Sequence, residues 1–321
     1  MAGTCDYCHS RPKRVEAGKV HAYCSKTCAS KAKTDDCQFC HAKPKAPGHQ
    51  YCGKTCAGKA NASGGAGQGK PFDTSTACLM CKKAPKQGQR NFCSKYCADS
   101  AESQAPLLLD VPSSHVTYKS VANQLHTSWK HTNRPSPRIK KIYKIVESHT
   151  LRAKYEAYKT KVEGKGHFEA KGMSPGNECR RWHGAHRGCK IGESGQTQLC
   201  SGQGCPICSI IRTSYDLQYS GNNFGWLRFG LGIYTSATSS KADDYICPNG
   251  PRPPVRALLL NTVVVGKGKT LTLDARTLTA PPAGFDSVLG EPKLLGSLNF
   301  DETVVYNNDA IRPSFLVIYD G

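Results

Sequence analysis

The feature that most constrains this chain is a cysteine pattern that occurs three times in its first third. Each copy has two Cys separated by two residues and then two Cys separated by three. A Cys-x2-Cys turn presents two thiolates, and Cys-x3-Cys places two more on the first turn of a helix, so the four fit a tetrahedral Zn²⁺. Each copy is too short to bury a core, so metal binding should supply most of its folding energy. The predicted ligands are Cys5, Cys8, Cys24 and Cys28; Cys37, Cys40, Cys52 and Cys56; and Cys78, Cys81, Cys93 and Cys97.

These copies predict zinc modules at residues 1–33, 34–60 and 78–100. Residues 61–77 are rich in Gly, Ser and Ala and are expected to form a flexible linker, and residues 101–112 a second one. The remaining residues, 113–321, are expected to form the main domain. Tyr-Cys-Ser-Lys-Thr-Cys at 23–28 resembles the first half of MYND-type fingers, which bind proteins, although the second half of such fingers is missing here.

Cysteine usage also bears on the compartment. Twelve of the 18 Cys precede residue 98, and the first 30 residues have no apolar core of the kind that a secretory signal needs. The longest apolar run, residues 257–265, is too short to cross a membrane. We therefore expect an intracellular protein of the nucleus or cytoplasm, without a membrane, in which dense Cys pairs bind metal rather than form disulfides.

The net charge of +20 indicates an acidic partner. Residues 1–100 hold 17 Lys and Arg against 6 Asp and Glu, but twelve thiolates on three Zn²⁺ would offset much of that excess. Residues 119–171 hold 13 Lys and Arg against 4 Glu. This stretch is either the solvated face of a helix or a patch for phosphate.

Apolar periodicity predicts an α+β main domain. Leu151, Tyr155, Tyr158 and Val162 recur at helical spacing and predict an amphipathic helix. Residues 138–145 are ambiguous by pattern, and residues 113–130 have mixed periodicity. From Trp226 onward, short β-branched and aromatic runs separated by Gly, Pro and Asn predict a sheet rich in antiparallel pairs.

One stretch of this domain, residues 229–245, points to a ligand site. Gly230 and Gly232 lack the Cβ atoms that would hold a ligand away from the strand, and Tyr234 follows. Tyr245 comes eleven residues later, so the two rings could face each other across a flat group. Alternatively, the glycines mark a bulge or a crowded strand in an ordinary sheet.

Two further motifs give the stretch a context. Upstream is Arg-Trp-His-Gly at 181–184, and downstream is Asn-Phe-Asp-Glu-Thr-Val-Val-Tyr at 299–306, followed by an alternating strand at 310–319. Together with Phe-Gly-x-Gly-Ile-Tyr and Lys-x-x-x-Tyr, they resemble the catalytic domain of the poly(ADP-ribose) polymerase family over about residues 113–321. The resemblance implies an antiparallel-rich, split-sheet ADP-ribosyltransferase domain. It also favours a strand over residues 138–145.

The resemblance also implies a role for each residue of the site. NAD⁺ would be the substrate, and ADP-ribose would pass to a protein acceptor with release of nicotinamide. His183 would anchor the nicotinamide ribose, the backbone of Gly184 would pair with the carboxamide, and Tyr234 and Tyr245 would enclose the ring. The other implied residues are Glu302 as the catalytic carboxylate, Lys241 at the cofactor and Arg212 at the diphosphate.

Pattern alone leaves two interpretations of Glu302. It shares a strand face with Phe300, Val304 and Tyr306, which places a charge among apolar neighbours, as in a cleft. It could equally be an edge-strand Glu that points to water.

Departures from the family pattern keep other functions open. Ala185 and Ala242 stand where the family usually has a hydroxyl residue, and each lost hydrogen bond weakens NAD⁺ binding by about 0.5 to 1.5 kcal/mol. Besides a transferase whose zinc modules recruit a protein target, the chain could be a polymer-forming member. It could also be a catalytically weak adaptor that reads NAD⁺ or ADP-ribose, and nucleic acid remains an alternative partner of the modules.

A Gly-rich insertion at residues 185–210 departs from the family as well. Its Cys189, Cys200, Cys205 and Cys208 predict a fourth, structural Zn²⁺ site, with His186 as a substitute ligand. Cys179 and Cys247 have no partner by spacing and are expected to be plain buried residues.

Overall fold

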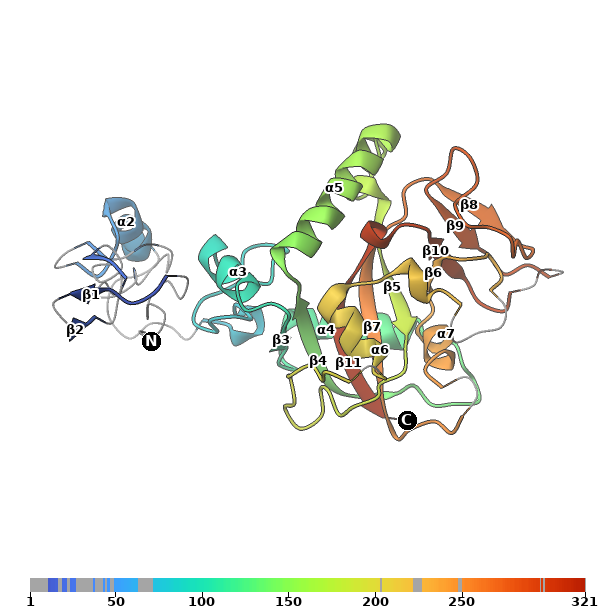
Figure 1. The fold of residues 1–321 in the computed structure, drawn as a ribbon, viewed down its shortest axis with the longest axis horizontal. Helices are drawn as coiled ribbons and strands as arrows, with labels where there is room; N and C mark the ends of the chain where they lie inside the picture. Colours follow the sequence, from blue (N-terminus) through green and yellow to red (C-terminus); the bar gives the residue numbers. More distant parts are fainter. Residues whose placement is uncertain are drawn as a thin grey trace. The chain divides into compact units, whose positions relative to one another are not determined.

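The computed structural model describes residues 11–16, 19–21, 24–26, 37, 43, 45–46, 49–62, 72–202, 204–221, 227–247, 250–294, 296 and 298–320. The chain divides into two compact units, Met1–Asp99 and Ser100–Gly321 (Figure 1).

The part of the first unit that the structure describes holds short elements, as expected for small modules without a core. Within its described residues, the elements are β1 (Val15–Glu16), β2 (Lys19–Val20), α2 (Lys54–Ala62), η1 (Thr74–Thr76) and the start of α3 (Lys95–Glu102). Most of the predicted linker at 61–77 falls on residues 63–71, which lie outside the described part of the chain.

The second unit alternates helices and strands, which agrees with the predicted α+β class. Its helices are α4 (Val116–Thr127), α5 (His149–Gly166), α6 (Pro206–Thr213) and α7 (Ser239–Asp244), with short η2 (Glu169–Lys171), η3 (Pro175–Asn177), η4 (Leu217–Tyr219) and η5 (Asn308–Ala310). Its strands are β3 (Leu107–Asp110), β4 (Arg138–Val146), β5 (Glu178–Gly184), β6 (Ile233–Thr235), β7 (Val255–Val264), β8 (Gly268–Leu271), β9 (Ser287–Gly290), β10 (Glu302–Val305) and β11 (Ile311–Asp320).

Five strands form the larger sheet, in the order β3-β4-β11-β7-β5, and all neighbours are antiparallel. The strand predicted over 138–145 is confirmed as β4. Residues 107–110, expected in a linker, instead pair with β4 as the edge strand β3. The sequence pattern did not reveal this strand because three consecutive leucines show no alternation.

The smaller sheet has the order β6-β10-β9-β8, in which only β8 and β9 are parallel. A single antiparallel bridge connects the two sheets, where the backbones of Trp182 and Ser236 exchange hydrogen bonds of 2.7 and 3.0 Å. The Arg181 Nε adds a second connection by donating to the Thr303 hydroxyl at 3.0 Å. The second unit is therefore a sheet split between β5 and β6.

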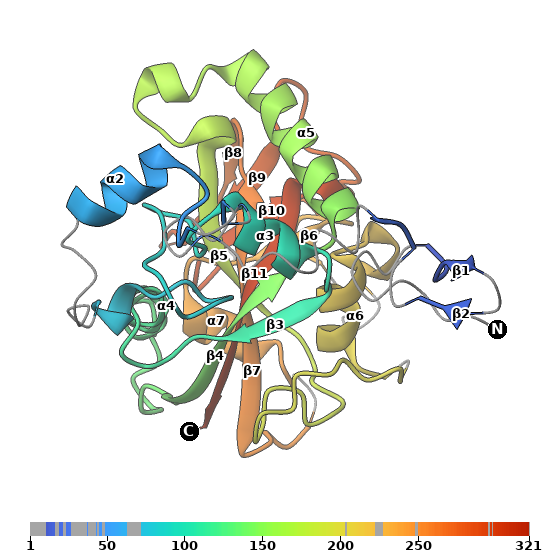
Figure 2. The same cartoon turned by 90° about the vertical axis from the view of Figure 1, so that its left-hand side faces the viewer.

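Helices cover both faces of the five-stranded sheet, with α4 and α6 on opposite sides of the strands (Figure 2). On one face, Ile207 and Ile211 of α6 pack with Leu259 and Leu316 in the main hydrophobic cluster. On the other face, Arg180 reaches the Ser120 hydroxyl of α4. The edge strand β5 therefore belongs to a sheet that is packed on both faces.

Helix α5 confirms the predicted amphipathic helix. Ser148 caps its first turn by accepting from the Leu151 N–H, and His167 ends it in the left-handed conformation. Tyr155 and Val162 are buried against Phe168 and Val264, while Lys154, Lys161 and Lys165 are exposed. None of the helices that the structure describes is both long and apolar enough to span a bilayer.

Candidate functional site

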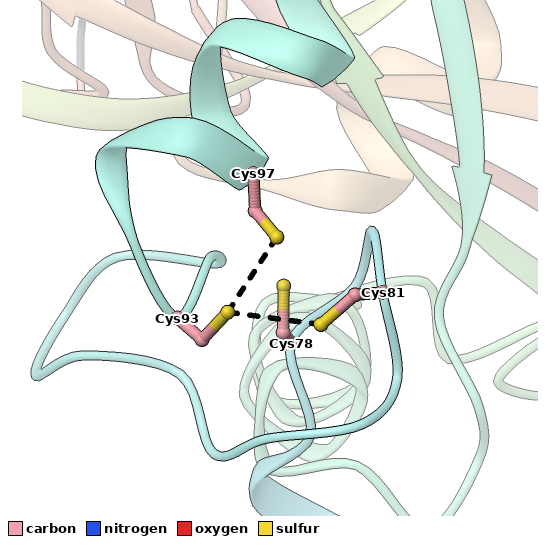
Figure 3. Close-up of side chains that lie close together, drawn as sticks. All are labelled: Cys78, Cys81, Cys93 and Cys97. Atoms are coloured by element: carbon pink, nitrogen blue, oxygen red, sulfur yellow. Dashed lines mark hydrogen bonds between the residues drawn. The ribbon is translucent and has the colours of Figure 1, made fainter. Parts of the chain in front are cut away.

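The third cysteine module forms a closed set of four sulfurs. Cys78, Cys81, Cys93 and Cys97 all lie within 4.8 Å of one another, with 3.7 Å between Cys81 and Cys93 and 3.5 Å between Cys93 and Cys97 (Figure 3). Two thiolates bound to one Zn²⁺ at 2.3 Å in a tetrahedron would lie about 3.8 Å apart, whereas a disulfide needs about 2.05 Å. The set therefore fits a metal ion and not two disulfides.

Local structure explains this arrangement. The turn after Cys78 is closed by hydrogen bonds to the carbonyls of Cys78 and Ala84, which gives the first pair its knuckle. Cys97 lies on the first turn of α3, where its N–H bonds the Ser94 hydroxyl. Burial raises the pKa of the Cys93 thiol to about 11. Thiolates at this position therefore require a cation to hold them in the ionised form.

The inserted cysteines form a second complete set. Cys189, Cys200, Cys205 and Cys208 lie within 4.8 Å of one another, and the Cys189 sulfur is 3.6 Å from those of Cys205 and Cys208. Cys205 directly precedes α6, and Cys208 lies on the first turn of that helix. The predicted ligand set is thus brought together, and it could hold Zn²⁺ on the same geometric grounds.

The first two modules are described only in part. Cys37, Cys52 and Cys56 of the second module gather within 4.8 Å, and Cys56 lies on α2. The fourth predicted ligand, Cys40, and three of the first module, Cys5, Cys8 and Cys28, fall outside the described residues, while Cys24 is half-buried.

The predictions for His186 and for the two unpaired cysteines need correction. His186 is exposed and is not part of the cysteine set; its Nδ1 lies 4.0 Å from the Cys247 sulfur. Cys247 and Cys179 are half-buried rather than buried. Arg212, expected at the diphosphate, lies on the exposed side of α6 and donates to the Cys200 carbonyl at 2.6 Å. Its role at a diphosphate stays a prediction.

Glu302 begins β10 and is 4 % exposed. Because β10 lies between β6 and β9, the edge-strand interpretation is wrong. The Lys241 ammonium and the Tyr245 hydroxyl both lie 3.0 Å from its Oε1. Its Oε2 is equally buried but has no hydrogen-bond partner among the described residues. One half of this carboxylate is therefore satisfied and the other is not.

His183 lies on β5 beside the split in the sheet. Its Nδ1 is 2.8 Å from the Tyr234 carbonyl, and since a carbonyl can only accept, Nδ1 carries the proton. Burial lowers the imidazole pKa below its usual 6.5. At neutral pH the ring is therefore uncharged, and Nε2 is a hydrogen-bond acceptor.

Gly184 is required by the close approach of α7. A Cβ at this position would lie 1.8 Å from the Ala242 carbonyl oxygen. The Trp182 N–H and C=O both bond Ser236 across the split, and backbone direction alternates along a strand. The N–H and C=O of Gly184, two residues on, therefore also point away from β7.

The glycines of the 229–245 stretch serve packing within the protein, so the expectation that they clear room for a ligand is wrong. Gly230 has a φ of +66°, and a Cβ there would lie 1.9 Å from the Leu278 carbonyl oxygen. At Gly232 a Cβ would lie 2.3 Å from the Val304 side chain. This stretch is the crowded strand that the pattern allowed as an alternative.

The two predicted rings are each held by their hydroxyl group. The Tyr234 hydroxyl accepts from the Phe229 N–H at 2.9 Å and donates to the Gly230 carbonyl at 2.8 Å. Tyr245 follows α7, and the Lys241 ammonium lies 5.5 Å from its ring centre. Burial raises the pKa of both phenols, so both remain neutral donors. Both rings are half-buried, and the Tyr234 ring packs against the hydrophobic cluster that contains Phe229 and Val304.

Asp301, next to Glu302, has a different environment. Its Oδ1 accepts from the hydroxyls of Ser236 at 2.9 Å and Thr238 at 2.8 Å, and its Oδ2 accepts from the Ala237 N–H at 2.7 Å. Asp301 thereby fixes the loop that connects Tyr234 to α7. Sequence analysis missed this role because its partners lie more than 60 residues away.

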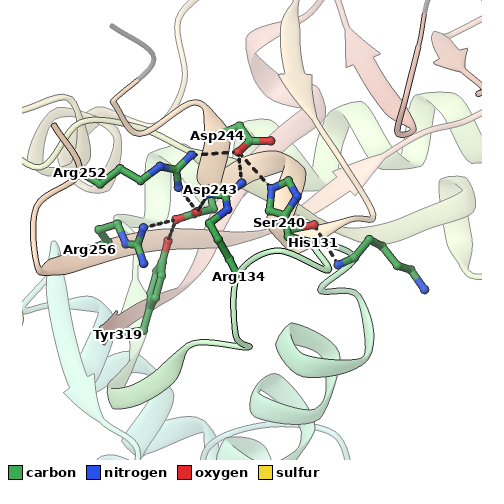
Figure 4. Close-up of polar contacts among 9 residues, drawn as sticks. His131, Arg134, Ser240, Asp243, Asp244, Arg252, Arg256 and Tyr319 are labelled. Atoms are coloured by element: carbon green, nitrogen blue, oxygen red, sulfur yellow. Dashed lines mark hydrogen bonds and ion pairs between the residues drawn. The ribbon is translucent and has the colours of Figure 1, made fainter. Parts of the chain in front are cut away.

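Asp243 and Asp244, the last two residues of α7, form a second group of carboxylates that anchors the helix (Figure 4). Arg134 and Arg252 each bridge Asp243 and Asp244, so two guanidinium groups clamp the two acids. The Tyr319 hydroxyl donates to the Asp243 Oδ1 at 2.6 Å, and the Arg256 guanidinium lies 3.5 Å from the same oxygen. Asp243 is fully buried, and both of its oxygens have partners.

Tyr215 connects the inserted cysteine set to His183. It follows α6, whose first turn carries Cys208, and its ring meets the His183 imidazole edge-on at 5.1 Å. Its hydroxyl donates to Asn261 at 2.7 Å, and Asn261 donates to the Arg181 carbonyl on β5. The insertion thus supports the strand that presents His183.

The structure brings six of the predicted residues together around the split between the sheets: His183, Gly184, Tyr234, Lys241, Tyr245 and Glu302. Arg212 lies on α6. No model of a known protein family matches the chain.

Proposed function

We propose that this protein is an NAD⁺-dependent ADP-ribosyltransferase that transfers ADP-ribose to a protein acceptor and releases nicotinamide. The observation that most supports this proposal is the half-satisfied Glu302. A buried carboxylate oxygen without a donor costs free energy, and an incoming hydroxyl would recover it. The ribose 2′-hydroxyl of NAD⁺ is such a donor.

The proposed chemistry needs few groups. When the bond between the nicotinamide nitrogen and ribose C1′ breaks, the electron pair leaves with nicotinamide and positive charge develops on the sugar. The Glu302 carboxylate stabilises that charge from a fixed, buried position. The acceptor then donates an electron pair to C1′ and loses its proton. Lys241 partly balances the carboxylate charge and holds its orientation.

The other residues serve binding. The acceptor Nε2 of His183 suits a ribose hydroxyl, and the outward N–H and C=O of Gly184 suit a carboxamide, which has both a donor and an acceptor. The rings of Tyr234 and Tyr245 offer apolar faces for the nicotinamide. The split antiparallel sheet supports an ADP-ribosyltransferase fold for residues 113–321, and the zinc modules are proposed to recruit the target protein.

Incubation of the purified full-length chain with NAD⁺ labelled in its adenylate part tests this proposal. We expect covalent label on the protein, together with an equal amount of released nicotinamide. Label that is bound but fully removed by denaturation would instead favour the adaptor that reads NAD⁺ or ADP-ribose. The buried Ala185 and Ala242, which offer no hydroxyl, are the observation that favours this second candidate.

A further inference from the structure

We propose that a lysine-rimmed groove between α5 and the β8–β9 region binds single-stranded nucleic acid. The groove is a cavity of about 190 Å³ whose walls include the rings of Tyr158, Phe285 and Tyr306. Lys161 and Lys165, on successive turns of α5, stand at its rim. It draws on the basic stretch at 119–171, from which Lys161 and Lys165 come and which the proposed transferase does not use.

Positive charge is concentrated around one ring of this groove. The Lys267 ammonium lies 4.9 Å and the Lys269 ammonium 5.3 Å from the centre of the Phe285 ring. Lys161 and Lys165 line the cavity itself, and Lys267 and Lys269 lie next to one of its walls, the Phe285 ring. Its single lining carboxylate, Asp286, accepts from the backbone N–H of Lys267 at 2.9 Å, so it is tied to its own loop. The groove thus has an excess of cations suited to phosphate.

The aromatic walls select the kind of polyanion. Tyr158 and Phe285 are half-buried, and burial raises the pKa of Tyr158 to about 12, so its ring is neutral and apolar at physiological pH. The cavity is smaller than the roughly 300 to 1,000 Å³ of a drug-sized ligand site, so it can admit a single flat group. Unpaired bases stack on aromatic side chains while a basic groove follows their phosphates. Bases within a duplex already stack on their neighbours and could not enter.

A second cavity extends the groove along α5. It has a volume of about 540 Å³ and shares Tyr306 and Asn307 with the first. Its charged lining is mixed, with Lys154 and Arg312 against Asp216 and Asp309. It therefore gives room for the strand to continue, while the two lysines of the first cavity and the two beside Phe285 supply the attraction.

The groove is separate from the proposed transferase site. Glu302 is the first residue of β10, and Tyr306 directly follows the last. Four residues of strand correspond to about 13 Å. Nucleic-acid binding here can therefore be measured without NAD⁺, and its outcome does not depend on the proposed transferase activity.

Fluorescence anisotropy with the zinc-loaded full-length chain and a labelled single strand of about twelve nucleotides tests the inference. Lys161→Ala and Lys165→Ala should each reduce the slope of log K against log salt by about 0.7 and weaken binding about fivefold at 0.1 M salt. Phe285→Leu should weaken binding at least about fivefold through lost stacking. Lys119→Ala, which removes an exposed lysine of α4, should change neither quantity.

Three outcomes would overturn the inference. If the groove variants bind like Lys119→Ala, the strand is held elsewhere in the chain. If poly-glutamate displaces the strand equally well from the wild type and from Phe285→Leu, the surface recognises only charge. Tighter binding of ADP-ribose polymer than of the oligonucleotide would identify a different ligand. Circular dichroism and zinc content verify that each variant is folded. If Phe285→Leu does not fold, the two lysine variants still test the groove.

Discussion

Helix α7 separates two regions whose polar groups are satisfied to different degrees. On one side, Asp243 is enclosed by three arginines and Tyr319, and both of its oxygens have partners. On the other, Lys241 and Tyr245 hold only one oxygen of Glu302, and Oε2 remains buried without a donor. Fully paired networks stabilise a fold, whereas a buried unpaired atom calls for an explanation such as a ligand. Glu102 and Glu147 each have one such oxygen too, so the unpaired oxygen supports a ligand site only together with its neighbours. This comparison underlies our proposal that the first region serves stability and the second chemistry.

The largest loss of stability is expected when the inserted cysteine set can no longer bind its metal ion. Cys208→Ser should lower the zinc content by one equivalent from the four expected in the wild type, and it should lower the unfolding midpoint of the second unit. Metal analysis and tryptophan fluorescence measure the two quantities, since all three tryptophans, at positions 129, 182 and 226, lie in that unit. Cys179→Ser, outside the cysteine set, is the matched control. An unchanged zinc content in Cys208→Ser would contradict the prediction that the inserted cysteine set binds zinc.

The next largest effect concerns the arginine clamp. Asp243→Ala leaves Arg134, Arg252 and Arg256 without their shared buried partner, which should cost about 3 to 5 kcal/mol of unfolding free energy. Urea unfolding followed by tryptophan fluorescence gives the value. Asp243→Asn, of equal size, is the companion variant and should cost less. A change below about 0.5 kcal/mol in Asp243→Ala would contradict the assignment of this region to stability.

A smaller effect is expected at Asp301. Asp301→Asn replaces an acceptor oxygen by a donor NH₂ opposite the Ser236–Thr238 loop, and the loss should be about 1 to 3 kcal/mol. Turnover by the folded protein should fall only modestly, since the residue acts through the loop. Glu291→Gln, at an exposed neighbouring position, should leave the unfolding free energy unchanged. If Asp301→Asn and Glu291→Gln change the unfolding free energy equally, Asp301 does not have the structural role that we assign to it.

The smallest effect at neutral pH comes from His183. Its folded pKa is lowered, so the unfolded chain binds the proton more readily; the stability contributed by the neutral ring is complete above pH 6.5 and is lost as pH falls. Protonation also removes the Nε2 acceptor. The acidic limb of the kcat/KM profile should therefore lie below pH 6.5 and be absent in His183→Gln. A limb centred above pH 7 would contradict the neutral, Nδ1-protonated ring.

Local sequence spacing predicted much of the framework. The period of residues 151–162 predicted α5, and the pairs at 189–208 predicted a cysteine set that the structure brings together, because both signals depend on residues close in the chain. Three leucines at 107–109 gave no such signal for β3.

Long-range pairing explains what the sequence did not reveal. Asp243 meets Arg134 across 109 residues and Tyr319 across 76, and Asp301 meets Ala237 across 64. Tyr215 reaches His183 only because α6 folds over the sheet. The bond from Arg212 to the Cys200 carbonyl likewise depends on the folded insertion. No spacing rule within one chain segment encodes such contacts.

Turnover of Glu302→Gln beside Asp301→Asn tests the proposed chemistry most directly. Both substitutions replace a carboxylate by an amide at adjacent positions. Nicotinamide release at saturating NAD⁺, normalised to folded protein, should fall on the order of 10²-fold or more in Glu302→Gln, because a charge that stabilises the transition state is lost. Its KM should change little, and Asp301→Asn should stay within about tenfold of the wild type. Near-normal kcat in a correctly folded Glu302→Gln protein would contradict the assignment of Glu302 as the catalytic carboxylate.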